Sequence, residues 1–155
     1  MRKLLFALLM TSSFAANAQQ EMPKAYNQLL KEVEPQMIAW RRHFHEFPEL
    51  SNRETNTGKY IADFLKTLPN LEVKYPVAKT GVVAVLKGGK PGPVVALRAD
   101  IDALPVSERV PVPFASKVKA EYNGQQVSVM HACGHDAHTA ILMATAKTLK
   151  DMQKD

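Results

Sequence analysis

The chain has 155 residues, a formal net charge of +5 at neutral pH and a single cysteine, Cys133. The mild positive excess is spread along the chain and does not favour nucleic-acid binding, and one cysteine excludes an internal disulfide framework. Without internal repeats or low-complexity tracts, the composition is that of one small unit with a single core.

The first 18 residues have the order of a cleavable export signal. They begin with the basic Arg2 and Lys3, continue with a short apolar run and end in the small-residue segment Ala16-Asn17-Ala18. The apolar run is far shorter than the roughly 20 residues that a bilayer span needs, and it is not amphipathic like an ordinary surface helix. We therefore expect residues 1–18 to be a signal peptide. The mature chain would begin near Gln19 and be exported to a bacterial periplasm or secreted, with no membrane association after cleavage.

The first element predicted in the mature chain is an amphipathic helix. From Tyr26 to Phe44 apolar residues recur at helical spacing, which indicates one buried face, with a bend or restart at Pro35. His43 and His45 lie two positions apart and so cannot face one ion from a helix. We expect both to be solvated or to lie behind a site.

A second helix and three short strands are predicted next. Ser51 to Glu54 has the capping-box pattern of a helix start, and the helix that follows should bury Tyr60, Ile61, Phe64 and Leu65. Runs at 71–77, 81–86 and 93–97 are rich in β-branched and apolar residues, and the short loop between the last two predicts that they pair as a hairpin. The run at 93–97 lacks alternation, as expected of a strand buried on both faces.

Two aspartates directly follow this last strand. Residues two apart on an extended chain point to the same side, so Asp100 and Asp102 should form a carboxylate pair. They lie at the carboxyl end of the strand, where open α/β sheets build their sites. The alternative is that one of them only caps the following turn.

The segment MHACGHDAHTA, residues 130–140, holds Cys133 and three of the five histidines. In an extended loop Cys133 and His135 would lie on one side, able to bind one metal ion, and Gly134 would allow a tight turn. Apolar positions after Asp136 predict a helix there, with a buried stripe at Ile141, Leu142, Ala146 and Leu149. The positive end of this helix favours the thiolate form that binds metals.

Two other interpretations of Cys133 stay open at this point. The thiol could be a nucleophile with a histidine base, although this gives no role to Asp100, Asp102 or Asp136. It could also be a buried structural cysteine, since free cysteines are commonly buried. His138, one turn into the helix, shares a face with His135 and could touch the site in any of these cases.

Three segments of the sequence together resemble a known family. They are RRHFHEFPELSNRETNT, LRADIDALPV with VPFAS shortly after, and MHACGHDAHTAILMATA. They are similar to the metal-dependent amidohydrolases that include hippurate hydrolase, bacterial N-acyl-amino-acid hydrolases and plant auxin-conjugate hydrolases, a subgroup of the aminoacylase and carboxypeptidase family. The resemblance implies an α/β fold in which residues 19–155 are the N-terminal portion of an α/β/α zinc-exopeptidase-like catalytic domain. Such a domain has a mixed sheet flanked by helices, and we expect this chain to be incomplete, without the rest of the domain and the dimerisation domain.

The resemblance also implies roles for the candidate residues. Cys133 and His135 would bind the catalytic metal, which would be one or two divalent ions, with zinc and manganese both compatible. Asp102 occupies the place of a metal-supporting aspartate, and Asp100 that of a ligand histidine in other branches, so both are expected to support the site rather than bind metal. Asp136 and His138 match the motif and are assigned to support or to substrate contact.

The implied reaction is metal-assisted hydrolysis of the amide bond of N-acyl amino acids or dipeptide-like substrates, by an enzyme that is a homodimer at full length. A glutamate would move the proton from water to the leaving amine. In the family this glutamate comes after the cysteine motif, so it is expected beyond Asp155, and no catalytic base is assigned in this chain. We accordingly expect the chain as it stands to be inactive. The competing hypothesis is a non-catalytic remnant or binding domain built on the start of the same fold.

Overall fold

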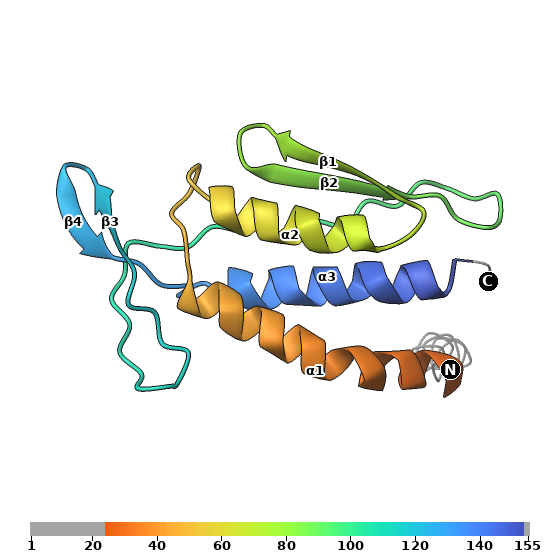
Figure 1. The fold of residues 1–155 in the computed structure, drawn as a ribbon, viewed down its shortest axis with the longest axis horizontal. Helices are drawn as coiled ribbons and strands as arrows, with labels where there is room; N and C mark the ends of the chain where they lie inside the picture. The colour runs from red at the N-terminus through yellow and green to blue at the C-terminus, as the bar shows by residue number, and fades with distance from the viewer. Residues whose placement is uncertain (1–23, 154–155) are drawn as a thin grey trace, which may run out of the picture.

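The computed structural model describes residues 24–153, and the predicted signal peptide lies outside them. The elements in chain order are α1 (Lys24–Glu46), α2 (Thr55–Thr67), β1 (Leu71–Val77), β2 (Gly81–Leu86), β3 (Lys119–Tyr122), β4 (Gln125–Ser128) and α3 (His135–Asp151). Figure 1 shows α3 lying between α1 and α2, with the β1–β2 hairpin on the far side of α2. None of the helices described is both long enough and apolar enough to cross a membrane.

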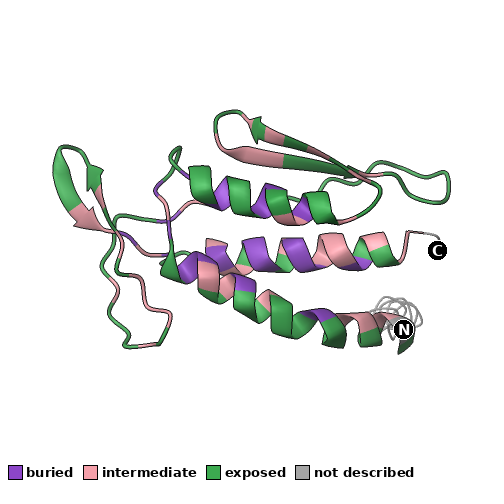
Figure 2. Ribbon diagram, viewed as in Figure 1, coloured by how far each residue is buried: buried purple, intermediate pink, exposed green. Residues whose placement is uncertain are grey.

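The core lies where the three helices meet. α1 continues through Pro35, so the predicted helix is confirmed and a restart at Pro35 is wrong. Trp40 of α1 packs against Phe64 of α2, with ring centroids 4.4 Å apart. Figure 2 shows buried residues on the sides of the helices that face one another; the buried cluster consists of Val33, Trp40, Phe44, Ile61, Leu65, Ala140, Met143 and Ala144.

The buried face of α3 differs from the predicted apolar stripe. Ile141 and Leu149 are exposed, whereas the residues turned inward are mostly small or polar: Asp136, Thr139, Ala140, Met143, Ala144 and Thr148. The small alanine side chains take part in the core cluster that α3 shares with α1. Thr148 can be buried because its hydroxyl donates to the Ala144 carbonyl at 3.0 Å.

The capping-box prediction for α2 is wrong, because another acidic residue caps the helix. Glu49 accepts hydrogen bonds from the Thr57 amide and the Thr57 hydroxyl, each at 2.8 Å. Ser51 makes no such bond, and Glu54 instead accepts a hydrogen bond from the Thr80 hydroxyl at 2.8 Å. A carboxylate from the preceding segment therefore satisfies the free amides of the first turn, while Glu54 joins α2 to the β1–β2 hairpin.

The first two predicted strands are confirmed, but their pairing is not as expected. β1 and β2 pair with each other in antiparallel register, with Leu71 opposite Leu86. The run at 93–97 is not a strand, and Val94 and Val95 are 98% and 76% exposed. A strand needs a hydrogen-bonded neighbour, and among residues 24–153 none pairs with this run.

A second hairpin, β3–β4, was not predicted. Its two strands have four residues each and are rich in polar side chains, so they carry little hydrophobic periodicity. The turn between them is Asn123-Gly124, with φ of 52° and 76°, and this dipeptide is a recognised hairpin signal. The chain thus mixes helix and strand as an α/β protein does, with two separate two-stranded sheets in the part described.

Gly58 gives a direct test of how α2 packs on the hairpin. A Cβ added there would lie 2.3 Å from the Thr80 carbonyl oxygen and 2.8 Å from the Tyr75 ring. Glycine to alanine within a helix normally stabilises by about 1 kcal/mol, but we expect Gly58→Ala to lower the free energy of unfolding by about 1–3 kcal/mol. Urea unfolding measures this, with Gly92→Ala as the matched control because nothing lies within 4 Å of its added Cβ. A higher unfolding midpoint for Gly58→Ala would contradict the packing described.

Candidate metal centre

The candidate site forms where two segments cross. One is the acidic segment, which follows the β1–β2 hairpin and carries Asp100 and Asp102; the other leads into α3. Leu104 and Met130 exchange two backbone hydrogen bonds, each 3.1 Å long. A small buried cluster lies beside the crossing. It consists of Leu50, Ala103 and Val129, which neighbour the crossing in sequence or pair with it. The crossing therefore holds residues far apart in the sequence side by side.

His135 and Asp102 meet at this crossing. His135 is the first residue of α3, and its Nδ1 lies 3.0 Å from Asp102 Oδ1 and 2.9 Å from the Asp102 backbone oxygen. Both neighbours of Nδ1 are acceptors, so Nδ1 carries a proton, and the neutral tautomer with this proton has its lone pair on Nε2. This is the arrangement in which a carboxylate orients a histidine that binds metal through its other nitrogen.

Cys133 lies in a bend rather than in the extended loop that the sequence argument assumed. Gly134 has a φ of +91°, in the left-handed region that glycine adopts without steric cost, and α3 begins directly after it. The Cys133 side chain is free and exposed. The interpretation of Cys133 as a buried structural cysteine is therefore wrong, and its thiol is accessible to a ligand.

Asp100 and His138 lie at the edge of this arrangement. The strand expected to lead into Asp100 and Asp102 is absent, although both residues line one shallow hollow with Arg98. The Asp100 carboxylate instead forms an ion pair with the exposed Arg98 at 2.5 Å. His138 is exposed, and its ring centroid is 6.3 Å from that of His135.

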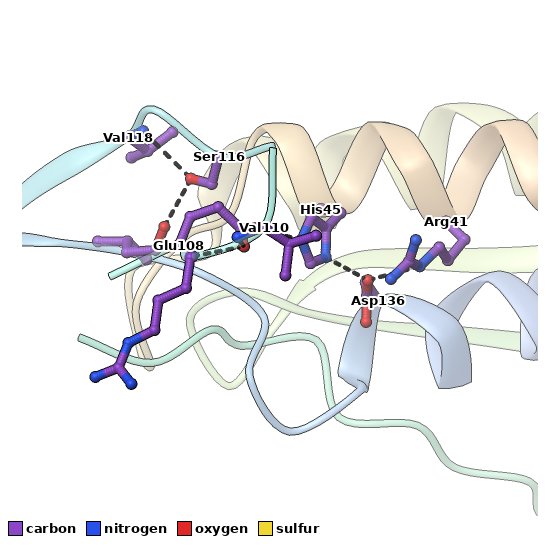
Figure 3. A network of polar contacts seen from close by, with 9 residues as sticks. Arg41, His45, Glu108, Val110, Ser116, Val118 and Asp136 are labelled. Carbon is purple, nitrogen blue, oxygen red and sulfur yellow. Dashed lines mark hydrogen bonds and ion pairs between the residues drawn. The ribbon is translucent and has the colours of Figure 1, made fainter. Parts of the chain in front are cut away.

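Behind the loop lies a buried charged cluster that the sequence analysis missed. Figure 3 shows the His45 ring and the Arg41 guanidinium directed at the Asp136 carboxylate, which is 2% exposed. Asp136 Oδ2 lies 2.8 Å from His45 Nδ1 and 3.0 Å from Arg41 Nε. On its other side, His45 Nε2 lies 2.8 Å from Glu108 Oε2. His45 is thus buried behind the site, which is one of the two placements expected for it, and it is not solvated. Its partners were not predicted; the available signal was its four-residue spacing from Arg41, which puts both on one helix face.

His43, the other histidine of α1, is separate from this cluster. Its ring is half-buried and stacks on Tyr60 with centroids 4.2 Å apart. Burial lowers its pKa below the usual value, and the nearby Glu46 partly offsets this.

His131 is the remaining histidine of the segment, and it is buried. It is 6% exposed, and neither ring nitrogen has a hydrogen-bond partner among the residues described. Burial lowers its pKa from 6.5 to about 4, while the Asp136 carboxylate opposes this shift and the neighbouring histidines reinforce it. His131 is therefore neutral at physiological pH.

Within residues 24–153, no three cysteine, histidine, aspartate or glutamate side chains converge as a complete metal site. Two of the residues nevertheless suit a metal by their chemistry. The Cys133 thiol is exposed, and His135 has a free Nε2 with its other nitrogen held by Asp102. This part of the chain thus offers two ligands and one supporting carboxylate, where a catalytic zinc usually has three protein ligands.

Comparison with known proteins identifies the family. The family model for peptidase family M20/M25/M40 matches residues 96–155, which include all the candidate site residues. The chain is 46% identical over 127 residues to an N-acyl-L-amino acid amidohydrolase of Geobacillus stearothermophilus, covering 82% of this chain and 32% of that protein. An N-acetyl-L-cysteine deacetylase of Bacillus subtilis is 45% identical over 124 residues, covering 80% and 28%. Over residues 96–155 the chain matches the M20 peptidase family, and along most of its length it is similar to M20 relatives.

The solved structures agree with this assignment. A dinuclear metal-binding M20 peptidase of Bacillus subtilis superposes with a TM-score of 0.70 at 45% identity, covering 80% of this chain and 32% of that one. The resemblance expected from the three sequence motifs is confirmed, and so is the expected α/β fold as part of an M20 domain. The chain spans about a third of the length of these M20 relatives.

The buried neutral His131 predicts that the stability of this chain depends on pH. The unfolded imidazole has a pKa near 6.5 and the folded one about 4, so the unfolded state binds the proton first as the pH falls. The contribution to stability is complete above pH 6.5 and declines toward pH 4, by about 3 kcal/mol in total.

Urea unfolding of the metal-free protein across this pH range tests the prediction. His131→Phe should flatten the decline, because the group that takes up the proton is gone. His138→Asn removes an exposed histidine and should leave the decline unchanged. An equally steep decline in His131→Phe would show that other groups cause it.

Proposed function

We propose that the protein is a metal-dependent amidohydrolase that cleaves the amide bond of N-acyl amino acids or dipeptide-like substrates. The observation that carries this proposal is the contact of His135 Nδ1 with Asp102, 3.0 Å long, which leaves Nε2 available two residues along the chain from the accessible Cys133. Relatives named N-acyl-L-amino acid amidohydrolase and N-acetyl-L-cysteine deacetylase support the substrate class. The active form is a homodimer of the full-length protein.

The metal would be held by Cys133 and His135, as one of one or two divalent ions. Bound there, it supplies a water of lowered pKa and polarises the amide carbonyl. A thiolate ligand favours zinc, and manganese is the alternative where carboxylates complete the site. The dinuclear M20 peptidase of Bacillus subtilis supports a second ion.

The residues around these ligands each have a part in preparing the site. Asp102 fixes the tautomer and the orientation of His135. Gly134 allows the turn that joins Cys133 to the start of α3. We assign His138, which is exposed with its ring 6.3 Å from that of His135, to substrate contact.

The general base would come from a part of the protein outside residues 24–153. Proton transfer needs a carboxylate that is free to approach a bound water. The least exposed glutamates described are engaged elsewhere: Glu49 caps α2, Glu54 binds Thr80, and Glu108 binds His45. We therefore assign no catalytic base among the described residues.

Replacing either proposed ligand should remove both metal and activity. In the full-length protein, Cys133→Ser and His135→Ala should each lose bound metal and lower hydrolysis of N-acetyl amino acids by at least about 100-fold, because few ligands hold the ion. Elemental analysis and an amino-acid release assay measure the two effects. His43→Ala, on the same chain but outside the site, should keep both.

The same experiment separates the metal ligand from a nucleophile. Normal metal content in Cys133→Ser would contradict the ligand assignment. If thiol labelling of Cys133 in the unsubstituted protein then abolished activity with the metal still bound, the nucleophile interpretation would replace the ligand assignment.

We also propose that the protein is exported, on the basis of the basic, apolar and small-residue order of its first 18 residues. Mass spectrometry of the periplasmic or secreted fraction should find a mature N-terminus near Gln19. Intact Met1 on protein in the cytosol would contradict this.

A further inference from the structure

His45 is bound on both sides of its ring by carboxylates that come from distant parts of the chain. Nδ1 lies 2.8 Å from Asp136, at the start of α3, and Nε2 lies 2.8 Å from Glu108, in the loop after the acidic segment. Both neighbours are acceptors, and the imidazole can donate to both only with a proton on each nitrogen. Arg41 supplies a fixed positive charge to the same cluster, at 3.0 Å from Asp136.

The burial of Asp136 makes this positive charge necessary. An ionised carboxylate that is 2% exposed is costly unless it is paired and hydrogen-bonded. Asp136 Oδ2 has both His45 and Arg41 within 3.0 Å, from one face of α1. The first turn of α3 is thus fixed to α1 at a charged point as well as through the apolar core.

The loop on the other side of His45 is fixed by the same residue. Glu108 Oε1 accepts hydrogen bonds from the Arg109 and Val110 amides at 2.9 and 3.0 Å, so the loop folds around the carboxylate that His45 binds. Phe114 of this loop meets the His45 ring edge-on, with centroids 5.8 Å apart and an interplanar angle of 84°. The Arg41 guanidinium carbon lies 5.1 Å from the centroid of the Phe114 ring.

Asp136 directly follows His135, so what holds Asp136 also holds the proposed ligand. Asp102 restrains His135 at its ring, and His45 restrains the helical turn that carries the ring. We propose that His45, acting through Asp136, is a positioning residue that keeps His135 and Cys133 oriented for one metal ion. This inference rests on the proposed function; His45 is neither a ligand nor a catalytic residue.

Cobalt binding to the full-length protein tests the inference without an activity assay. A cobalt–thiolate absorption band reports the Cys133 ligand, and competition with a chelator gives the metal affinity. We expect His45→Gln to stay folded by circular dichroism, to bind cobalt about 10–100-fold more weakly and to show a weaker band, as is usual when a supporting partner is lost. His43→Ala, two residues away on α1 and outside the charged cluster, should match the unsubstituted protein.

Asp136→Asn provides a second variant of nearly unchanged shape. It keeps the side-chain volume but removes the charge that His45 binds, so its cobalt affinity should fall in the same range. A folded His45→Gln protein with normal cobalt affinity and a normal cobalt–thiolate band would overturn the inference. If His45→Gln does not fold, normal cobalt affinity and a normal band in Asp136→Asn would overturn it instead. Absence of the thiolate band from the unsubstituted protein would overturn the proposed function and this inference together.

Discussion

The ionised carboxylate of Asp136, buried at the start of α3, is the constraint on which the site depends. A charge removed from water must be matched by partners at hydrogen-bond distance, and here both partners come from the last turns of α1. This fixes how far α1 and α3 can slide past each other. The apolar core alone would define that position less sharply, because hydrophobic contact is not directional.

The site is assembled from three segments that are each weakly structured by themselves. The acidic segment around Asp102 forms no regular strand, the Cys133 loop is a bend, and the loop holding Glu108 has no secondary structure. Backbone bonds at the Leu104–Met130 crossing and side-chain bonds at His45 and His135 join them to the helices. Functional groups on loops are thus oriented by a rigid scaffold through a few polar contacts.

Sequence patterns predicted those features that are encoded locally. β1 and β2 begin and end at the predicted residues, and α1 has the expected buried face, because period and propensity act over short distances. The pairing of β1 with β2, the cap from Glu49 and the exposure of Val94 were not predictable, since each depends on which distant group lies alongside.

The same reasoning explains the outcome for the site. The segment with Cys133 and His135 was visible because its candidate ligands are bunched in sequence. The family resemblance gave Asp102 a supporting role, but its contact with His135 was not predicted. The role of His45 depends on partners 63 and 91 residues away, so no local pattern could show it. Its spacing from Arg41 indicated a shared face but not what that face would meet.

The two proposed ligands are restrained unequally, and this has a consequence for metal binding. His135 is held at its ring by Asp102 and through its helical turn by Asp136. Cys133 is exposed and lies before Gly134, whose left-handed conformation is a point of backbone freedom. In the proposed site the imidazole would therefore be preorganised, whereas the Cys133 side chain would be ordered by the ion, at the expense of part of the binding energy.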